Sequence, residues 1–252
     1  MQIKLENVSY KNLNNLSFKI ENEKITGIVC NDIKDLININ YVILNNIKDL
    51  GTIKYSPRYS KNKIGIISIS NVSELINGSL YDFINLKKVD EELLNLFSMD
   101  KNIENRDIDT FSNTEKIKLL FLKVLTQEYD TILINGIFEE LDMDMRKKFI
   151  KIIINLKKFQ KKTILLSTTD INIIYEFIDN LIIILDGQSL SCSNKFSIYD
   201  EENIVNNPLI QKPFIKKIED MVYNKSNIDL GNNDSINELI KAIYREIRWY
   251  YD

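Results

Sequence analysis

The stretch that decides the fold of this 252-residue chain is Ile132-Leu133-Ile134-Asn135-Gly136-Ile137-Phe138-Glu139-Glu140-Leu141-Asp142. It joins a short apolar run, typical of a strand buried on both faces of a parallel sheet, to a polar turn, and a helix-spaced segment follows. Similar apolar runs lie at residues 25–30, 64–67, 163–166 and 181–185, and helix-spaced segments lie at 33–47, 114–127 and 143–158. Strands that alternate with helices predict an α/β fold with a mostly parallel sheet and crossover helices.

The flanking segments predict three additions to this core. Residues 2–20 alternate between apolar and polar side chains, which is typical of antiparallel strands with one wet face. Residues 79–110 are charged and helical in pattern, so we expect a helical subdomain over about 79–127. Two helices are expected at 213–224 and 235–250, the second opened by a capping box at Ser235 and Glu238. We therefore predict a main domain at 1–198 and a C-terminal helical extension at 199–252.

Composition excludes several classes of function. The chain has no histidine, and its two cysteines, Cys30 and Cys192, show no metal-ligand spacing. The net charge of −3 gives no support for nucleic acid as a partner. No apolar run approaches the ~18 residues of a membrane-spanning helix, and Met1 is not followed by the apolar core of a signal peptide. We expect a cytoplasmic protein without a resident metal ion or a disulfide.

The order of these segments resembles an ABC-type ATPase over essentially the whole chain. Ile132–Asp142 falls without a gap on the family's three apolar residues, Asp-Glu-Pro-Thr, two variable residues and Leu-Asp, and it retains Leu141 and Asp142 of the D-loop. Residues 163–170 match the strand that ends in the family's switch histidine. The soft motifs between Phe196 and Leu239 are similar to the C-terminal region of the A subunits of energy-coupling factor (ECF) transporters. The resemblance implies an ABC fold with an antiparallel β subdomain.

The loop that should bind phosphate lacks the residues that this chemistry needs. A phosphate loop uses glycines, so that backbone N–H groups can reach the phosphate oxygens, and a lysine. Here the loop has no glycine and brings two carboxylates, which repel an anion. Lys34 is either the remnant of the phosphate lysine or a solvated surface lysine, and the second account is favoured. The loop consists of Cys30, Asn31, Asp32, Ile33, Lys34 and Asp35.

The other site positions implied by the resemblance have also changed. Asn135 replaces the aspartate that helps to hold Mg²⁺, and Gly136 replaces the glutamate that polarises the attacking water. Thr169 replaces the switch histidine. In the family's signature only Ser112 is retained. The remaining changed positions are Asn113 and Thr114 in the signature, Ile69 in place of the Q-loop glutamine, and Asn12, near which the adenine-stacking aromatic would fall, with Tyr10 two residues early.

These losses lead to one favoured function and two alternatives. The favoured function is a pseudo-ATPase subunit that pairs with a competent ABC ATPase subunit beneath a transmembrane T subunit and an S component, for micronutrient uptake at the inner face of the membrane. No cofactor is certain, and ATP-Mg is expected only at a composite site to which Ser112 and Asp142 contribute. The first alternative is a binding or regulatory module outside transport, and the least favoured is a divergent active ATPase. The sequence does not identify the transported substrate.

Overall fold

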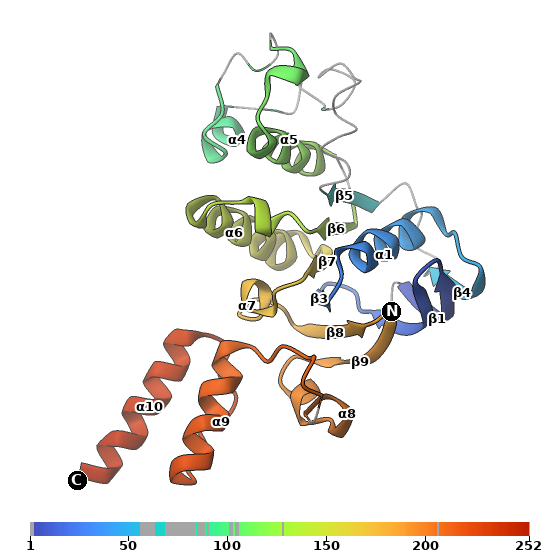
Figure 1. Cartoon of the computed structure of the whole chain (residues 1–252). Helices are drawn as coiled ribbons and strands as arrows, with labels where there is room; N and C mark the ends of the chain where they lie inside the picture. Colours follow the sequence, from blue (N-terminus) through green and yellow to red (C-terminus); the bar gives the residue numbers. More distant parts are fainter. Residues whose placement is uncertain are drawn as a thin grey trace.

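The computed structural model describes residues 3–55, 64–68, 91–100, 106–127, 129–205 and 207–251, together with Ile84, Val89 and Ile103. The chain forms two sheets, a set of covering helices and a C-terminal pair of helices (Figure 1). Among the described residues, no helix is long and apolar enough to cross a bilayer.

The main sheet has six strands in the order β5-β6-β7-β3-β8-β9. The first five are parallel, and β9 pairs antiparallel with β8. Their bounds are β5 Ile64–Ser68, β6 Thr131–Asn135, β7 Thr163–Thr168, β3 Ile25–Cys30, β8 Asn180–Leu185 and β9 Gln188–Asn194. Every residue of β6 and β7 is buried, which explains their continuous apolar sequences and confirms the predicted α/β fold.

Side chains from this sheet enter two separate hydrophobic cores. Leu133 and Leu165 point toward helix α1 (Ile33–Asn45) and the smaller sheet, whereas Ile134 and Leu166 point toward the helices on the other face. Those helices are α5 (Asn113–Thr126), α6 (Met143–Gln160) and the short α7 (Ile171–Ile174). Alternate residues of one strand thus hold the two layers on opposite faces of the sheet.

The smaller sheet is antiparallel, with the order β2-β1-β4. Strands β1 (Ile3–Tyr10) and β2 (Leu13–Ile20) confirm the alternation read from the sequence. Strand β4 (Leu50–Tyr55) was not predicted, because only Ile53 of its six residues is buried. The edge strand β9 was not predicted either, since it buries none of its seven residues fully.

The helical layer beyond β5 holds α4 (Glu91–Leu96), a 3-10 turn at Ile108–Thr110, and α5. A cluster of three aromatic rings joins it to α6: Phe121 stacks on Phe149 at 4.0 Å, and Phe97 contacts both. Most of the predicted helical subdomain between residues 79 and 105 lies outside the described residues.

The C-terminal helices α9 (Phe214–Ser226) and α10 (Ile236–Tyr251) project from the body of the protein as an adjacent pair (Figure 1). A buried lysine, Lys195, ties them to the body through a 2.7 Å ion pair with Asp234. Half of the predicted capping box forms: the Glu238 N–H donates to Ser235 Oγ, but the Glu238 carboxylate accepts from the Asp234 N–H. The predicted division of the chain at residue 198 stays a prediction.

Candidate functional site

Most of the predicted site residues lie along one edge of the main sheet, where the parallel strands end. The loop from Cys30 to Asp32 joins β3 to α1, Asn135 ends β6, and Thr169 follows β7. Gly136 lies next to this row, with φ of 60° and its N–H donating to the Ser167 carbonyl at 3.0 Å. Ligands of open α/β sheets bind at this edge, so the topology brings the predicted positions to the expected place.

The N-terminus of α1 is capped by its own chain. Asp32 takes an extended conformation, and its Oδ1 accepts the Lys34 N–H at 2.8 Å. The Asp35 N–H donates to the Asp32 carbonyl at 3.1 Å. The Lys34 side chain is exposed to solvent. A carboxylate of this chain thus occupies the end of the helix where backbone N–H groups and the helix dipole attract anions.

Asp35 joins three segments that are far apart in the sequence. Its buried carboxylate accepts one hydrogen bond from the Asn12 side-chain amide and another from the Gly187 N–H at 3.2 Å. Asn12 also accepts from the amide of Asn38. Burial raises the pKa of Asp35, and the negative charges of nearby carboxylates act in the same direction. This carboxylate therefore holds the β1–β2 turn and the β8–β9 turn against α1.

The aromatic residue nearest to the predicted adenine position is engaged elsewhere. The ring of Tyr10 stacks on that of Tyr41 in α1, with centroids 5.9 Å apart and planes 22° apart. The Lys11 ammonium lies 5.1 Å from the centroid of Tyr10 and 5.9 Å from that of Tyr41. Asn12 is not aromatic and binds Asp35, and the ring of Tyr10 is stacked on Tyr41. The structure therefore shows no adenine-stacking role for either residue.

Asn135 is buried beneath the first turn of α1. Its Nδ2 donates to the Leu36 carbonyl at 3.4 Å and to Ser68 Oγ at 3.5 Å. Its Oδ1 and the neighbouring Ser167 Oγ have no hydrogen-bond partner among the described residues. The amide donor at this position therefore holds α1 to the sheet.

Glu139 is a residue of the edge that sequence analysis missed. It lies in a 3-10 turn at Phe138–Glu140, and its Oε1 accepts from Thr168 Oγ1 at 2.6 Å and from the Thr169 N–H at 3.3 Å. Its only sequence signal was a pair of adjacent carboxylates, which is also typical of a solvated turn. The structure thus puts a carboxylate against the backbone of the predicted switch position.

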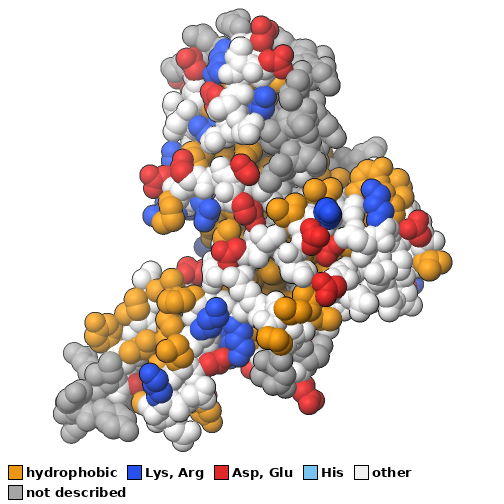
Figure 2. All heavy atoms as spheres, in the orientation of Figure 1, with side chains coloured by type: hydrophobic (Ala, Val, Ile, Leu, Met, Phe, Trp, Pro, Cys, Tyr) orange, Lys and Arg blue, Asp and Glu red, His pale blue; other side chains and the backbone are white. Residues whose placement is uncertain are grey.

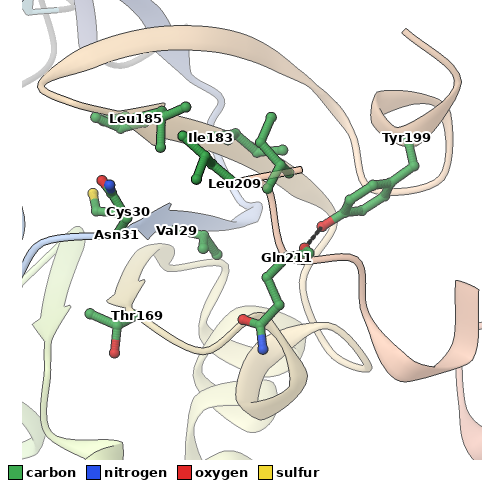
Figure 3. A pocket seen from close by; sticks show the side chains of 11 residues that line it. Val29, Cys30, Asn31, Thr169, Ile183, Leu185, Tyr199, Leu209 and Gln211 are labelled. Carbon is green, nitrogen blue, oxygen red and sulfur yellow. Dashed lines mark hydrogen bonds between the residues drawn. The ribbon is translucent and has the colours of Figure 1, made fainter. Parts of the chain in front are cut away.

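A cavity of about 70 Å³ opens beside this edge (Figure 3). The ends of β3 and β8 form one wall, and the connector that leads to α9 forms the other. Tyr199 donates its hydroxyl proton to the Gln211 carbonyl at 3.2 Å, and the Gln211 side chain accepts the Ile171 N–H at 3.3 Å. The residues that line the cavity include Cys30, Asn31, Thr169, Ile183, Leu209 and Gln211. The C-terminal extension therefore begins in direct contact with the residues that follow β7.

Comparison with solved structures identifies the architecture. CbiO1 of Clostridium perfringens, part of the ABC transporter complex cbiONQ, superimposes with a TM-score of 0.61 at 18% identity, covering 89% of this chain and 95% of CbiO1. A dimeric bacterial ABC transporter cassette superimposes with a TM-score of 0.58 at 16% identity, covering 77% of this chain and 98% of the cassette. The chain has the ABC ATPase fold.

Sequence comparison gives a resemblance within this class. An ECF transporter ATP-binding protein, EcfA2 of Spiroplasma kunkelii, is 25% identical over 157 residues, which is 61% of this chain and 50% of that protein. EcfA1 of Mycoplasma mobile is 23% identical over 181 residues, 66% of this chain and 65% of that protein. No protein-family model matches the chain. The chain spans about half to two thirds of the length of these relatives, and it resembles the ATP-binding subunits of ECF transporters.

The predicted signature and D-loop positions of this chain start two helices. Ser112 caps α5: its Oγ accepts the Glu115 N–H at 3.3 Å, and its own N–H donates to the Glu115 carboxylate at 2.9 Å. Hydrogen bonding to Arg106 is the main cause that lowers the pKa of Glu115 to about 2. Asp142 caps α6 by accepting the Met145 N–H at 2.8 Å.

The predicted signature positions are not brought to the edge. The signature positions Ser112, Asn113 and Thr114 start α5, which lies with α4 in the helical layer and apart from α1 (Figure 1). The Q-loop position Ile69 lies outside the described residues. Within this chain, the structure therefore groups the phosphate-loop, Asn135 and switch positions but not the signature.

Proposed function

We propose that this chain is an ABC-type subunit whose own catalytic half-site is lost, and that it works as a pseudo-ATPase partner of a competent ATP-binding subunit. The observation that carries the proposal is the capped N-terminus of α1. There the Asp32 carboxylate accepts the Lys34 N–H that a phosphate oxygen would need. A second carboxylate, that of Asp35, is fixed within the same turn.

The donors and acceptors at this edge do not fit a magnesium–ATP complex. Phosphoryl transfer depends on positive groups that neutralise the phosphates and on a base that positions the attacking water. Here Asp32 and Asp35 are acidic, the Lys34 side chain is exposed, and Asn135 offers a neutral amide whose N–H groups face protein oxygens. Gly136 has no side chain to position water. We therefore assign no step of ATP hydrolysis to this half-site.

The proposed partners follow from the relatives. The similar proteins are named as ATP-binding proteins of ECF transporters, so we assign this chain to such a transporter, where it pairs with a second ABC ATPase subunit and contacts T and S components. In this assembly ATP-Mg binds at a composite site on the partner subunit. Ser112 and Asp142 would face that nucleotide across the interface. The chain would be held at the inner face of the membrane by these contacts, in a system for micronutrient uptake.

A nucleotide titration tests the lost half-site. The purified chain is titrated with ATP-Mg by calorimetry, alone and mixed with an intact ECF ATP-binding subunit, and phosphate release is measured in parallel. We expect no saturable binding and no turnover by this chain alone, because Asp32 already caps the helix end and the carboxylates of Asp32 and Asp35 repel the phosphates. The intact subunit alone is the positive control. Micromolar affinity together with turnover by this chain alone would refute the proposal.

A second experiment separates a transport role from a regulatory module outside transport. The chain is co-expressed with an intact ECF ATP-binding subunit and a T subunit, and the membrane fraction is solubilised and purified through the T subunit. We expect this chain to co-elute in stoichiometric amount with both. Recovery of the T subunit with two copies of the intact ATP-binding subunit and without this chain would favour the regulatory alternative.

A further inference from the structure

The positive charge of this acidic protein is concentrated in one segment. Residues 145–169 carry eight Lys and Arg side chains and no Asp or Glu, whereas the whole chain has a net charge of −3. The other 227 residues therefore carry a net charge of −11. This segregation is hidden in the overall composition; the segment covers α6 after its acidic first-turn residue Asp144, the turn that follows the helix, and β7.

Three of these eight cations are used inside the protein. Arg146 donates to the carbonyls of Phe138 and Leu141, and Lys157 pairs with Asp179 at 2.6 Å. Lys148 donates to Ser98 Oγ at 3.2 Å. These contacts attach α6 to its neighbours, so the three side chains are not available to a ligand.

The remaining five lysines lie toward solvent. Lys147, Lys151 and Lys158 are exposed and recur at spacings of four and seven residues, so they share one face of α6 over roughly 16 Å. Lys161 and Lys162 follow at the end of the helix. None of the five forms an ion pair within the part of the chain that the structure describes. This leaves a row of ammonium groups that begins beside the Asp144 carboxylate of the same helix, and Figure 2 shows acidic as well as basic side chains in the region of α6.

Exposed apolar side chains lie on this basic face and beside it. Phe159 is 72% exposed and Ile154 is 37% exposed, and the Lys158 ammonium lies 5.5 Å from the centroid of the Phe159 ring. The opposite face of α6 is fixed in the core by Phe149, Ile153 and Leu156. The helix cannot turn to bury its outer apolar residues, so they stay available to an external surface.

We propose that the outer face of α6 binds directly to an anionic lipid surface, with the lysines against the headgroups and Phe159 at the boundary with the acyl chains. Lysine rows combined with an exposed aromatic residue are typical of helices that lie on such surfaces. A lipid surface also offers anionic charge over the full length of the row. This contact goes beyond the proposed function, which holds the chain at the membrane only through other subunits, and it requires no partner.

Vesicle sedimentation of the purified full chain tests the proposal. One set of vesicles contains phosphatidylglycerol and phosphatidylcholine, and the other contains phosphatidylcholine alone. We expect binding only to the anionic vesicles, with affinity falling as salt rises. Each lysine contributes about fivefold in affinity, the equivalent of about 1 kcal/mol, so Lys147→Gln, Lys151→Gln and Lys158→Gln together should weaken binding about 100-fold.

A matched triple variant tests whether a loss of vesicle binding comes from this face of α6 or from the change in net charge alone. Lys217, Lys225 and Lys241 are exposed on α9 and α10, and changing all three to Gln gives the same change in charge. We expect that variant to bind nearly as well as the natural chain, and Phe159→Ser to bind several-fold more weakly. Equal losses in both triple variants, binding to phosphatidylcholine alone, or binding to single-stranded RNA without binding to vesicles would overturn the proposal. The thermal unfolding of each variant is measured to verify folding.

Discussion

Changing Asn135 to Asp introduces the residue that the resemblance to ABC ATPases predicts at this position, yet we expect it to destabilise this protein. The natural Asn135 amide donates to the Leu36 carbonyl at 3.4 Å and to Ser68 Oγ at 3.5 Å, at a position where only 4% of the residue is exposed. A carboxylate has no N–H to donate and would face a carbonyl oxygen in a buried place. The substitution therefore removes an attachment of α1 to the sheet and adds an unpaired charge.

The magnitude follows from two contributions. Losing the hydrogen bonds of the Asn135 amide costs about 0.5–1.5 kcal/mol, because the Leu36 carbonyl keeps the Asn40 side-chain amide as a donor at 3.0 Å. A pKa raised by one to two units by burial adds about 1.4–2.7 kcal/mol at neutral pH. The sum is about 2–4 kcal/mol, which lowers the melting temperature by about 10 °C in a domain of this size. Asn135→Ala is the matched control, because it loses the donor but adds no charge, so it should cost only the first contribution.

Thermal unfolding at two pH values measures both contributions. A buried carboxyl with a raised folded-state pKa destabilises most at pH values above that pKa, and this penalty disappears below the unfolded value of about 3.9. The difference between Asn135→Asp and Asn135→Ala should therefore be larger at pH 8 than at pH 5. Magnesium chloride should stabilise neither variant. If Asn135→Asp were as stable as the natural chain, or were stabilised selectively by Mg²⁺, the proposal that this edge does not suit a metal would be refuted.

Three further predictions concern stability at other positions. Ser112→Ala and Asp142→Ala should each lower the free energy of unfolding by about 1 kcal/mol, since each removes a helix cap. Urea titration measures this difference, and an unchanged free energy of unfolding would contradict the prediction. Burial raises the pKa of Glu219, so its carboxylate destabilises the fold as pH rises through that pKa. Glu219→Gln keeps an acceptor for both Asn233 donors, which lie at 3.1 and 2.8 Å. This variant should be more stable than the natural chain at pH 8 but not at pH 4, and thermal unfolding would measure the difference. Gly187→Ala should cost at least about 3 kcal/mol, because φ is +74° and the new Cβ would lie 1.9 Å from a backbone oxygen; unchanged stability in chemical denaturation would contradict this geometry.

The strands that the sequence predicted are those in which the burial of the residues is visible in the local sequence as an apolar pattern. Strands β6 and β7 bury every residue, so a continuous apolar run was sufficient to identify them. Strand β9 is a polar edge strand with the sequence Gln188-Ser189-Leu190-Ser191-Cys192-Ser193-Asn194, and β4 buries one side chain. Their positions depend on pairing with β8 and β1 rather than on their own residues, so no local pattern distinguishes them from loops.

The candidate site was predicted as a set of positions but not as a set of contacts. The order of segments put the phosphate loop, Asn135 and Thr169 at the ends of strands, which is enough to gather them at one edge. The contacts of Asp35 were not predictable, because Gly187 is 152 residues further along the chain. The two residues meet only because β3 and β8 are neighbours in the sheet. The contact of Gln211 with the start of α7 depends in the same way on where the connector crosses the sheet.

Ser112 and Asp142, two of the residues that the resemblance predicts to be retained from the family's nucleotide site, also have a structural role within this chain. Ser112 forms a complete capping box with Glu115, and Asp142 caps α6, so each satisfies backbone donors that would otherwise be left at a helix end. Asn135 and Gly136 lie at the end of β6, where the proposed loss of a ligand and a base would leave the strand intact. Retention of Ser112 and Asp142 is therefore explained by stability alone. A role in a partner's nucleotide site requires the further observation that substitutions preserving the cap, such as Asp142→Asn, still reduce the partner's activity.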